Sequence, residues 1–239
     1  MNRTIVVGDV HGCRKELEAL LEQVAFTSSD KLVFVGDLIA RGPDSRGVLQ
    51  VARQVEAVVV RGNHEAKLLA WRSHSPENRS SPLIQLSPMH LAIAQELTEA
   101  DWALLESTSL WHNLPEHELL IVHAGLLPGL PVEQQEPWTL LHIRGLTPQG
   151  TPCAEKQNQR WWGAAYQGPP HVVFGHNAFS EPQIHAWATG IDTGCVYGGK
   201  LTALVLSQGE KLPRGEQVKE LLISYTAAQA YCPRRGLRP

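Results

Sequence analysis

Three short segments of the chain place metal-binding side chains directly after an apolar run. The runs are short and rich in β-branched residues, which is typical of buried parallel strands, and they cover Thr4 to Val7, Leu32 to Val35 and Ala57 to Val60. The strand ends of an open α/β sheet meet along one edge, where ligands bind. We therefore expect the side chains that follow these three strands to converge at one site.

The residues after these strands are carboxylates, imidazoles and an amide. The segments are Gly8-Asp9-Val10-His11-Gly12, Gly36-Asp37-Leu38 and Arg61-Gly62-Asn63-His64-Glu65. Two later apolar runs lead in the same way to His123 and His176. The expected ligands of one ion are Asp9, His11 and Asp37, and those of a second ion are Asp37, Asn63, His123 and His176. A mixed oxygen and nitrogen set of this kind suits Mn(II), Fe or Zn(II) better than Ca(II).

The front half of the chain alternates strand and helix signals, so we predict an α/β fold. Apolar residues recur at helical spacing after the first strand, and Pro43 is expected to open a helix after the second. The β-α-β-α-β order indicates a parallel sheet with right-handed crossovers. Residues 73–113 carry two helical stretches, and we interpret them as a small helical insertion within a single domain, residues 1–239. Further strands are expected at His171 to Phe174, Gln183 to Trp187 and Leu201 to Leu206.

Composition and charge argue against several classes of protein. The formal net charge is -3, whereas a general nucleic-acid binder needs a basic face. No segment approaches the roughly 18 apolar residues of a membrane span. A cleaved signal peptide of ordinary length would remove Asp9 and His11, so we expect a cytoplasmic protein. The 4 cysteines are far apart in sequence and are expected to be reduced thiols.

Five motifs in a fixed order resemble those of the metallophosphoesterases: GDVHG, GDLIARGPDS, VRGNHE, HAG and FGH. The branch that they resemble most contains serine/threonine phosphatases, the bacteriophage lambda protein phosphatase and the symmetrical diadenosine tetraphosphate hydrolases. The resemblance spans Asp9 to about Leu206. It implies a four-layer αββα sandwich with a dinuclear centre, filled mostly by Mn(II) in such enzymes, and hydrolysis of phosphoric esters or anhydrides by a metal-activated hydroxide.

Four further residues are expected to act on the substrate. Arg41 and Arg61 can match phosphate geometry with planar guanidinium groups, so we expect them to bind substrate and to take part in catalysis. Arg144 resembles a third phosphate-binding arginine that follows the histidine motif in related enzymes. His64 lies beside Asn63 and resembles the general acid that protonates the leaving oxygen.

Other residues of chemically active types are expected to be structural. His90, like the other histidines of the insertion and the loops, is expected to be solvated or to cap a helix. Core packing is expected for Cys13 and, ahead of stacking on a nucleobase, for the pair Trp161-Trp162. Asp192 lies in a predicted turn.

Ala40 departs from the serine/threonine phosphatases, in which an aspartate at this position orients the catalytic histidine. A carboxylate there would hold the His64 imidazole and raise its pKa. Diadenosine tetraphosphate hydrolases are similar to this chain in carrying an alanine, and anhydride leaving groups need less protonation. We therefore expect hydrolysis of a phosphorylated small molecule, of the symmetrical diadenosine tetraphosphate type.

Two other functions remain open at this point. The same motifs also fit a protein serine/threonine or dual-specificity phosphatase, whose substrate would be a phosphoprotein. A non-catalytic phosphate-binding module that keeps the fold is the second alternative, although such a relative should have lost metal ligands or His64. The complete set of ligand positions favours an enzyme.

Overall fold

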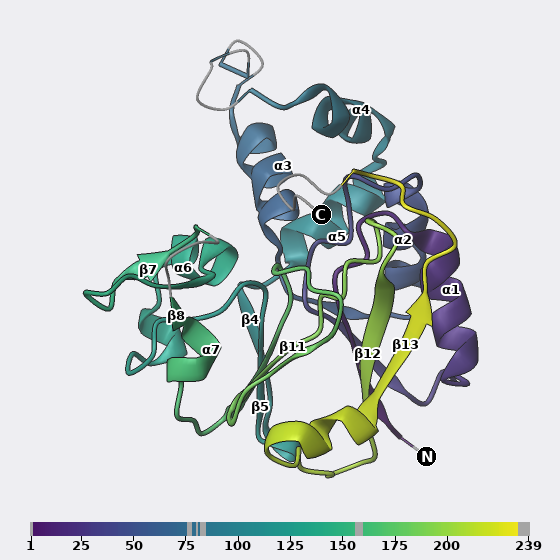
Figure 1. The fold of residues 1–239 in the computed structure, drawn as a ribbon. Coiled ribbons are helices and arrows are strands. Elements are labelled where there is room, and N and C mark those ends of the chain that lie inside the picture. Colours follow the sequence, from purple (N-terminus) through teal and green to yellow (C-terminus); the bar gives the residue numbers. More distant parts are fainter. Residues whose placement is uncertain (1, 76–77, 80, 82–84, 156–159, 234–239) are drawn as a thin grey trace.

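The computed structural model describes residues 2–75, 78–79, 81, 85–155 and 160–233. Two five-stranded sheets are stacked at its centre, and helices cover their outer faces (Figure 1). This arrangement confirms the predicted αββα sandwich.

The first sheet has the strand order β13-β12-β1-β2-β3. Its strands are β1 (Thr4–Val7), β2 (Lys31–Phe34), β3 (Val58–Val59), β12 (Lys200–Leu206) and β13 (Leu222–Thr226). The three strands predicted from the front half are parallel, but β12 pairs antiparallel with β1, so the sheet is mixed. The crossover helices α1 (Arg14–Gln23) and α2 (Ser45–Gln54) pack on this sheet. Helix α2 begins after Pro43 because the Asp44 side chain caps it, accepting a hydrogen bond from the Gly47 N–H at 2.7 Å.

The second sheet has the strand order β10-β11-β9-β5-β4. Its strands are β4 (Trp111–Leu114), β5 (Leu119–Val122), β9 (His171–Phe174), β10 (Gln183–Ile184) and β11 (Ala188–Gly190). The single strand predicted over 183–187 is wrong. The chain forms a hairpin there, because the His185 N–H donates to the Ala188 carbonyl at 2.9 Å and closes a turn between β10 and β11.

The remaining elements surround the two sheets. They are α3 (Asn63–Ser73), α4 (Pro88–Glu96), α5 (Glu99–Ser107), α6 (Pro137–His142), α7 (Trp162–Ala165), the 3-10 turns at Pro115–His117, Val132–Gln134 and Gly215–Leu221, and a small sheet of β6 (Gly145–Leu146), β7 (Pro152–Cys153) and β8 (Arg160–Trp161). Helices α4 and α5 lie in the segment for which a helical insertion is predicted, beside α3 (Figure 1). Among the described residues, no helix is long and apolar enough to cross a bilayer.

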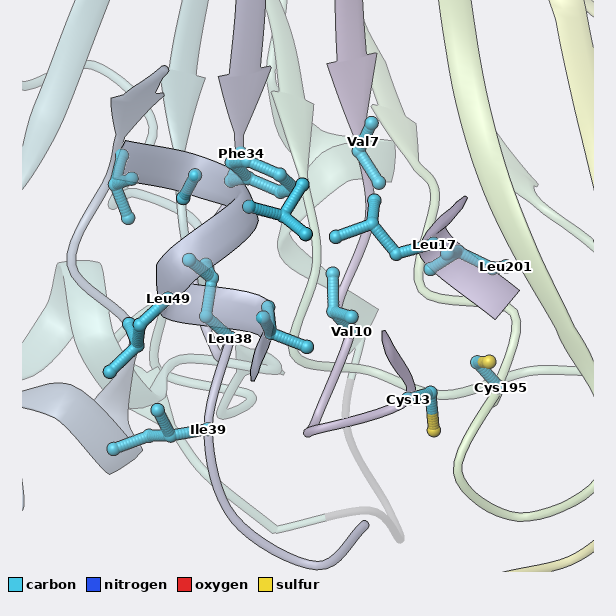
Figure 2. Packing of buried hydrophobic residues seen from close by; sticks show 14 of the residues in the cluster. Val7, Val10, Cys13, Leu17, Phe34, Leu38, Ile39, Leu49, Cys195 and Leu201 are labelled. Carbon is cyan, nitrogen blue, oxygen red and sulfur yellow. The ribbon is translucent and has the colours of Figure 1, made fainter. Parts of the chain in front are cut away.

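The core consists of layers because successive side chains of a strand point to opposite faces of a sheet. Val6 of β1 packs between the two sheets, with Ile121 of β5 and Leu204 of β12. Its neighbours Ile5 and Val7 belong to the cluster on the other face of the sheet, with Leu17 of α1 and Leu49 of α2. Figure 2 shows Val7, Leu17 and Leu49 in this cluster. A third cluster covers the outer face of the second sheet. It includes Trp162, whose indole N–H donates to the Ala124 carbonyl at 3.0 Å, so this tryptophan belongs to the core.

Asp30 joins the beginnings of β1 and β2. Its carboxylate accepts hydrogen bonds from the backbone N–H and the guanidinium group of Arg3 and from the Thr27 N–H. The Arg3 hydrogen bonds are the largest influence on the pKa of Asp30, which they hold below its ordinary value although burial opposes them. The charged form therefore stabilises the native state above the pKa of the unfolded chain, about 3.9 for Asp, and this stabilisation is lost as the pH falls.

We predict that Asp30→Asn lowers the free energy of unfolding by about 2 kcal/mol near pH 7, because hydrogen bonds to a buried charge are replaced by weaker ones. The deficit shrinks as the pH falls below about 4. Urea unfolding of metal-free protein over this pH range measures both effects. Glu22→Gln, on the exposed face of α1, is the control. A deficit that does not change with pH would contradict the assigned role of the Asp30 charge.

Candidate metal centre and phosphate site

The six predicted metal ligands lie in loops that follow strands or at the start of a helix that follows one. His11, Asp37 and His176 have φ values of 49°, 49° and 65°, so the chain turns sharply at these residues. This left-handed conformation is uncommon for residues other than glycine, although Asp and His tolerate it better than most. The turns direct side chains from both sheets toward one place.

Asp37 lies at the centre of the cluster. Its Oδ1 accepts a hydrogen bond from the His64 backbone N–H at 3.0 Å. Its Oδ2 lies 3.6 Å from Nε2 of His11 and 3.5 Å from Nε2 of His123. An oxygen between two imidazole nitrogens is in the position that a bridging ligand requires, which supports the predicted role of Asp37.

The predicted ligands of the second ion are brought together closely. Asn63 Oδ1 lies 3.1 Å from His123 Nε2 and 3.0 Å from His176 Nδ1. On the other side of its ring, His123 Nδ1 lies 3.1 Å from the Val35 carbonyl, to which it can donate. The lone pair of His123 Nε2 then faces the oxygens of Asn63 and Asp37. A cation would satisfy these facing acceptors, so the residues present fit a metal ion.

The predicted ligands of the first ion are brought together only in part. His11 Nδ1 lies 3.0 Å from the Ile39 carbonyl, which leaves Nε2 as the ligand atom. The ligand atoms of His11, Asp37 and His64 lie within 4.8 Å of one another, a set that contains His64 in place of Asp9. Both oxygens of the Asp9 carboxylate instead accept from the His176 backbone N–H, at 3.0 and 3.2 Å. Asp9 thus lies at the junction of the two predicted sets.

The charges of the cluster also favour a divalent cation. Burial raises the pKa of Asp9 well above its ordinary value, and the nearby Asp192 and Asp37 carboxylates raise it further. Burial raises the pKa of Asp37 to about 7. Burial and Arg41 lower the pKa of His11 to about 3, so its imidazole is neutral, as a metal ligand must be. Positive charge placed among these groups would relieve the cost of ionising buried carboxylates.

Asp192 contributes to the site more than its predicted role in a turn suggests. It is buried and lines the same cavity as Asp37 and His176. The signal that could have identified it is an aspartate placed two residues after a buried strand, β11, as Asp9 is placed after β1.

Glu65 is a structural residue of the site that the sequence reasoning missed. Its Oε2 accepts hydrogen bonds from the backbone N–H groups of Asp37 and Gly62, both at 2.9 Å. Its Oε1 accepts from Leu38 at 2.9 Å and Ile39 at 3.3 Å. A Cβ at Gly62 would overlap Asp37 and Glu65, so only glycine allows this contact. The signal for Glu65 is a glutamate at the third residue of α3, the position that closes a capping box.

The three predicted phosphate arginines differ in their surroundings. Arg41 and Arg144 line a cavity of about 730 Å³ together with Asp37 and His176. Arg41 Nη1 lies 2.9 Å from His11 Nε2, and Arg144 Nε donates to Asn177 Oδ1 at 2.7 Å.

Arg61 is not among the residues that line this cavity. Its guanidinium group donates to the side chain and carbonyl of Thr108 at 2.9 and 2.6 Å, so its role with phosphate stays a prediction.

His64 is buried beside the cluster, with its ring centroid 5.2 Å from that of His11. Its Nδ1 lies 2.8 Å from Nε2 of His90. The prediction that His90 is solvated or a simple cap is wrong, because helix α4 brings it inward and leaves it only 4% exposed.

We predict that Glu65→Gln weakens Mn(II) binding by about tenfold or more, as loss of a residue that orients metal ligands commonly does. The amide offers one acceptor oxygen and turns its NH₂ group toward backbone N–H groups. Isothermal titration calorimetry with Mn(II) measures the affinity. Glu96→Gln, on the exposed side of α4, is the control. An unchanged affinity would show that Glu65 does not hold the ligand loops in place.

Comparison with known proteins places this geometry in a family. The sequence model of the calcineurin-like phosphoesterase family matches residues 2–207 of this chain. The asymmetrical bis(5'-nucleosyl)-tetraphosphatase PrpE of Halalkalibacterium halodurans is 35% identical over 225 residues, 83% of this chain and 88% of that protein. A crystal structure assigned as a diadenosine tetraphosphatase has a TM-score of 0.77 and 34% identity, over 95% of this chain and 94% of that one.

A serine/threonine phosphatase structure from Saccharomyces cerevisiae has a TM-score of 0.59 and 15% identity, over 95% of this chain and 79% of that one. At this identity the likeness concerns the fold alone. The family match covers most of the chain and includes all five motifs. The chain therefore belongs to the calcineurin-like phosphoesterase family, the metal-dependent phosphohydrolases that its motifs resemble.

Proposed function

We propose that the chain hydrolyses dinucleoside tetraphosphates, such as diadenosine tetraphosphate, asymmetrically into a nucleoside triphosphate and a nucleoside monophosphate. The names of the similar proteins support this class of substrate. The structural observation that carries the proposal is the cavity beside the metal-ligand cluster, whose lining combines cationic, acidic and apolar side chains.

The cavity lining offers groups suited to phosphate and groups suited to a nucleoside. Arg41 and Arg144 lie with Asp37 and His176, where phosphate oxygens would meet positive charge. The remaining lining residues include Pro88, Met89, Tyr197 and Pro233. A volume of about 730 Å³ is in the range of sites that enclose whole small molecules and exceeds what a phosphate group alone needs.

Apart from Arg61, each predicted site residue can be given a task in the reaction. Arg41 and Arg144 would hold the phosphate chain, and Asp9, His11, Asp37, Asn63, His123 and His176 would hold two divalent ions, which we propose to be Mn(II). When bound, the two ions supply an activated water nucleophile and charge for the phosphate oxygens. A new oxygen–phosphorus bond forms as the bridging P–O bond breaks. His64 would donate a proton to the departing phosphate oxygen.

Symmetrical cleavage, expected from the sequence, finds no support among these relatives, which are named asymmetrical. The motifs could not distinguish symmetrical from asymmetrical cleavage, because they build the metal cluster, which is shared by both kinds of enzyme. The bond that breaks depends on how far the phosphate chain extends past the ions. We propose that this distance is set by the residues of the cavity lining that hold the nucleoside, most of which lie outside the five motifs.

Product analysis tests the proposal directly. With diadenosine tetraphosphate and Mn(II) we expect equal amounts of ATP and AMP by ion-exchange chromatography, and none after chelation. In ¹⁸O-labelled water, label in AMP identifies attack at the phosphorus next to the nucleoside. Two molecules of ADP would contradict asymmetrical cleavage. Preference for a phosphopeptide over the dinucleotide by kcat/KM would favour a protein phosphatase instead.

We predict that Arg144→Met lowers kcat/KM for the dinucleotide by roughly ten- to a hundredfold, the equivalent of one lost charge-assisted contact to phosphate. Steady-state kinetics at saturating Mn(II) give this ratio. Arg160→Met removes an exposed arginine outside the cavity and should leave kcat/KM unchanged. Equal effects of the two substitutions would show that Arg144 acts through the overall charge of the protein.

A further inference from the structure

His64, His90 and Ser87 form a hydrogen-bonded series that begins beside the metal-ligand cluster, in which both histidines are buried and Ser87 is half-buried. His90 Nε2 lies 2.8 Å from His64 Nδ1, and His90 Nδ1 lies 2.7 Å from Ser87 Oγ. The planes of the two imidazole rings differ by 12°, which suits hydrogen bonds directed along ring lone pairs. The histidines are 7% and 4% exposed, so the contact between their two rings is shielded from water, whereas half-buried Ser87 lines the cavity.

The position of His90 is fixed by the start of helix α4. Ser87 is the N-cap residue, and its hydroxyl accepts the His90 backbone N–H at 3.4 Å as well as lying against the His90 ring. Pro88 occupies the first helical position, which favours helix initiation here. The helix cap therefore sets both where His90 lies and which way its ring faces.

We propose that His90 is a positioning residue for the reaction: it orients His64 and fixes its tautomer, a role for which Ala40 offers no carboxylate. The inference rests on the proposed function, in which His64 is the acid. It gives helix α4 a role in orienting the acid, because the orienting group comes from α4 rather than from the loop after β2.

The donors and acceptors fit this role when protons are placed in order. His90 donates its Nδ1–H to Ser87 Oγ, and its Nε2 lone pair accepts the Nδ1–H of His64. The second proton of the His64 imidazolium is then on Nε2, which has no hydrogen-bond partner among the described residues. When the P–O bond breaks, this proton passes to the leaving phosphate oxygen and His64 becomes neutral, still donating from Nδ1. Water reprotonates it after product release.

A neutral imidazole acceptor differs from a carboxylate in the charge that it offers. It can orient His64 through one hydrogen bond, but it stabilises the imidazolium less than a negative charge would. This is sufficient for anhydride leaving groups, which are weak bases. Esters with more basic leaving groups depend more on the acid, so they report most sensitively on its orientation.

The test compares wild type with His90→Leu on two aryl phosphates, p-nitrophenyl phosphate and phenyl phosphate, at saturating Mn(II). We expect kcat to fall by about tenfold for phenyl phosphate and by less than twofold for the p-nitrophenyl ester, because only the former needs protonation. KM and Mn(II) content should stay unchanged. Leu91→Ala, at an exposed position of the same helix, is the matched control. His90→Gln, whose amide oxygen can accept from His64 Nδ1, should recover most of the activity.

A double-mutant cycle separates positioning of His64 from general support of α4. His90→Leu should cause no further loss in a His64→Asn background. An equal loss for both esters, or the same loss with and without His64, would overturn the inference. If His64→Asn itself leaves the difference between the two esters unchanged, the acid role fails, and with it both the proposed mechanism and this inference. If His64→Asn alters that difference while His90→Leu does not, only the role of His90 is overturned.

A spectroscopic readout covers the case in which His90→Leu does not fold. In ¹⁵N-labelled wild type, long-range ¹H–¹⁵N correlation spectra should show His64 protonated on Nδ1 and unprotonated Nε2 on His90. Ser87→Ala should alter the shifts of the His90 ring and shift kcat in the same direction as His90→Leu, by a smaller factor. A His64 tautomer that lacks the Nδ1 proton in wild type would overturn the inference.

Discussion

The geometry of the metal-ligand cluster depends on a buried carboxylate that is not itself an expected ligand. Glu65 accepts backbone N–H groups from the loop after β2 and from the start of α3, and so it fixes the relative positions of Asp37 and Asn63. Burial raises the pKa of Glu65 to about 7, yet its ionised form is the better acceptor for four N–H donors. Cations bound nearby would favour that form, so ligand geometry and metal binding support each other.

The sheets and the insertion have different parts in this protein. The strand-end loops build a cluster that the family shares, and they leave open which phosphorylated molecule is bound. Helix α4 provides Pro88 and Met89 to the cavity wall and His90 to the ring of His64. In the mechanism that we propose, substrate selection and the orientation of the acid are therefore linked through one short helix. We expect a change in this segment to alter the choice of substrate without disturbing the metal ligands.

Much of the fold and the cluster could be predicted from the sequence because both follow from local patterns. Apolar runs that end in Gly-Asp or Gly-Asn-His specify strands and the residues at their ends, and the fold brings His123 and His176 to Asn63 as expected. The roles of His90 and Glu65 could not be predicted in this way. His90 depends on a contact with His64, which is distant in sequence, and Glu65 depends on its buried hydrogen bonds to backbone N–H groups. For Arg61 the local pattern alone is not enough. Its motif suggests phosphate binding, but its guanidinium group contacts Thr108, which is distant in sequence and comes close only in the folded chain.

Electron paramagnetic resonance of protein loaded with Mn(II) tests most directly whether Asp37 bridges two ions. An oxygen shared between His11 and His123 predicts two ions per chain and the spectrum of an exchange-coupled pair. That coupled signal should be lost in Asp37→Asn. A wild-type spectrum of one ion per chain, or of two independent ions, would contradict the proposed bridging role of Asp37 and the proposed dinuclear centre.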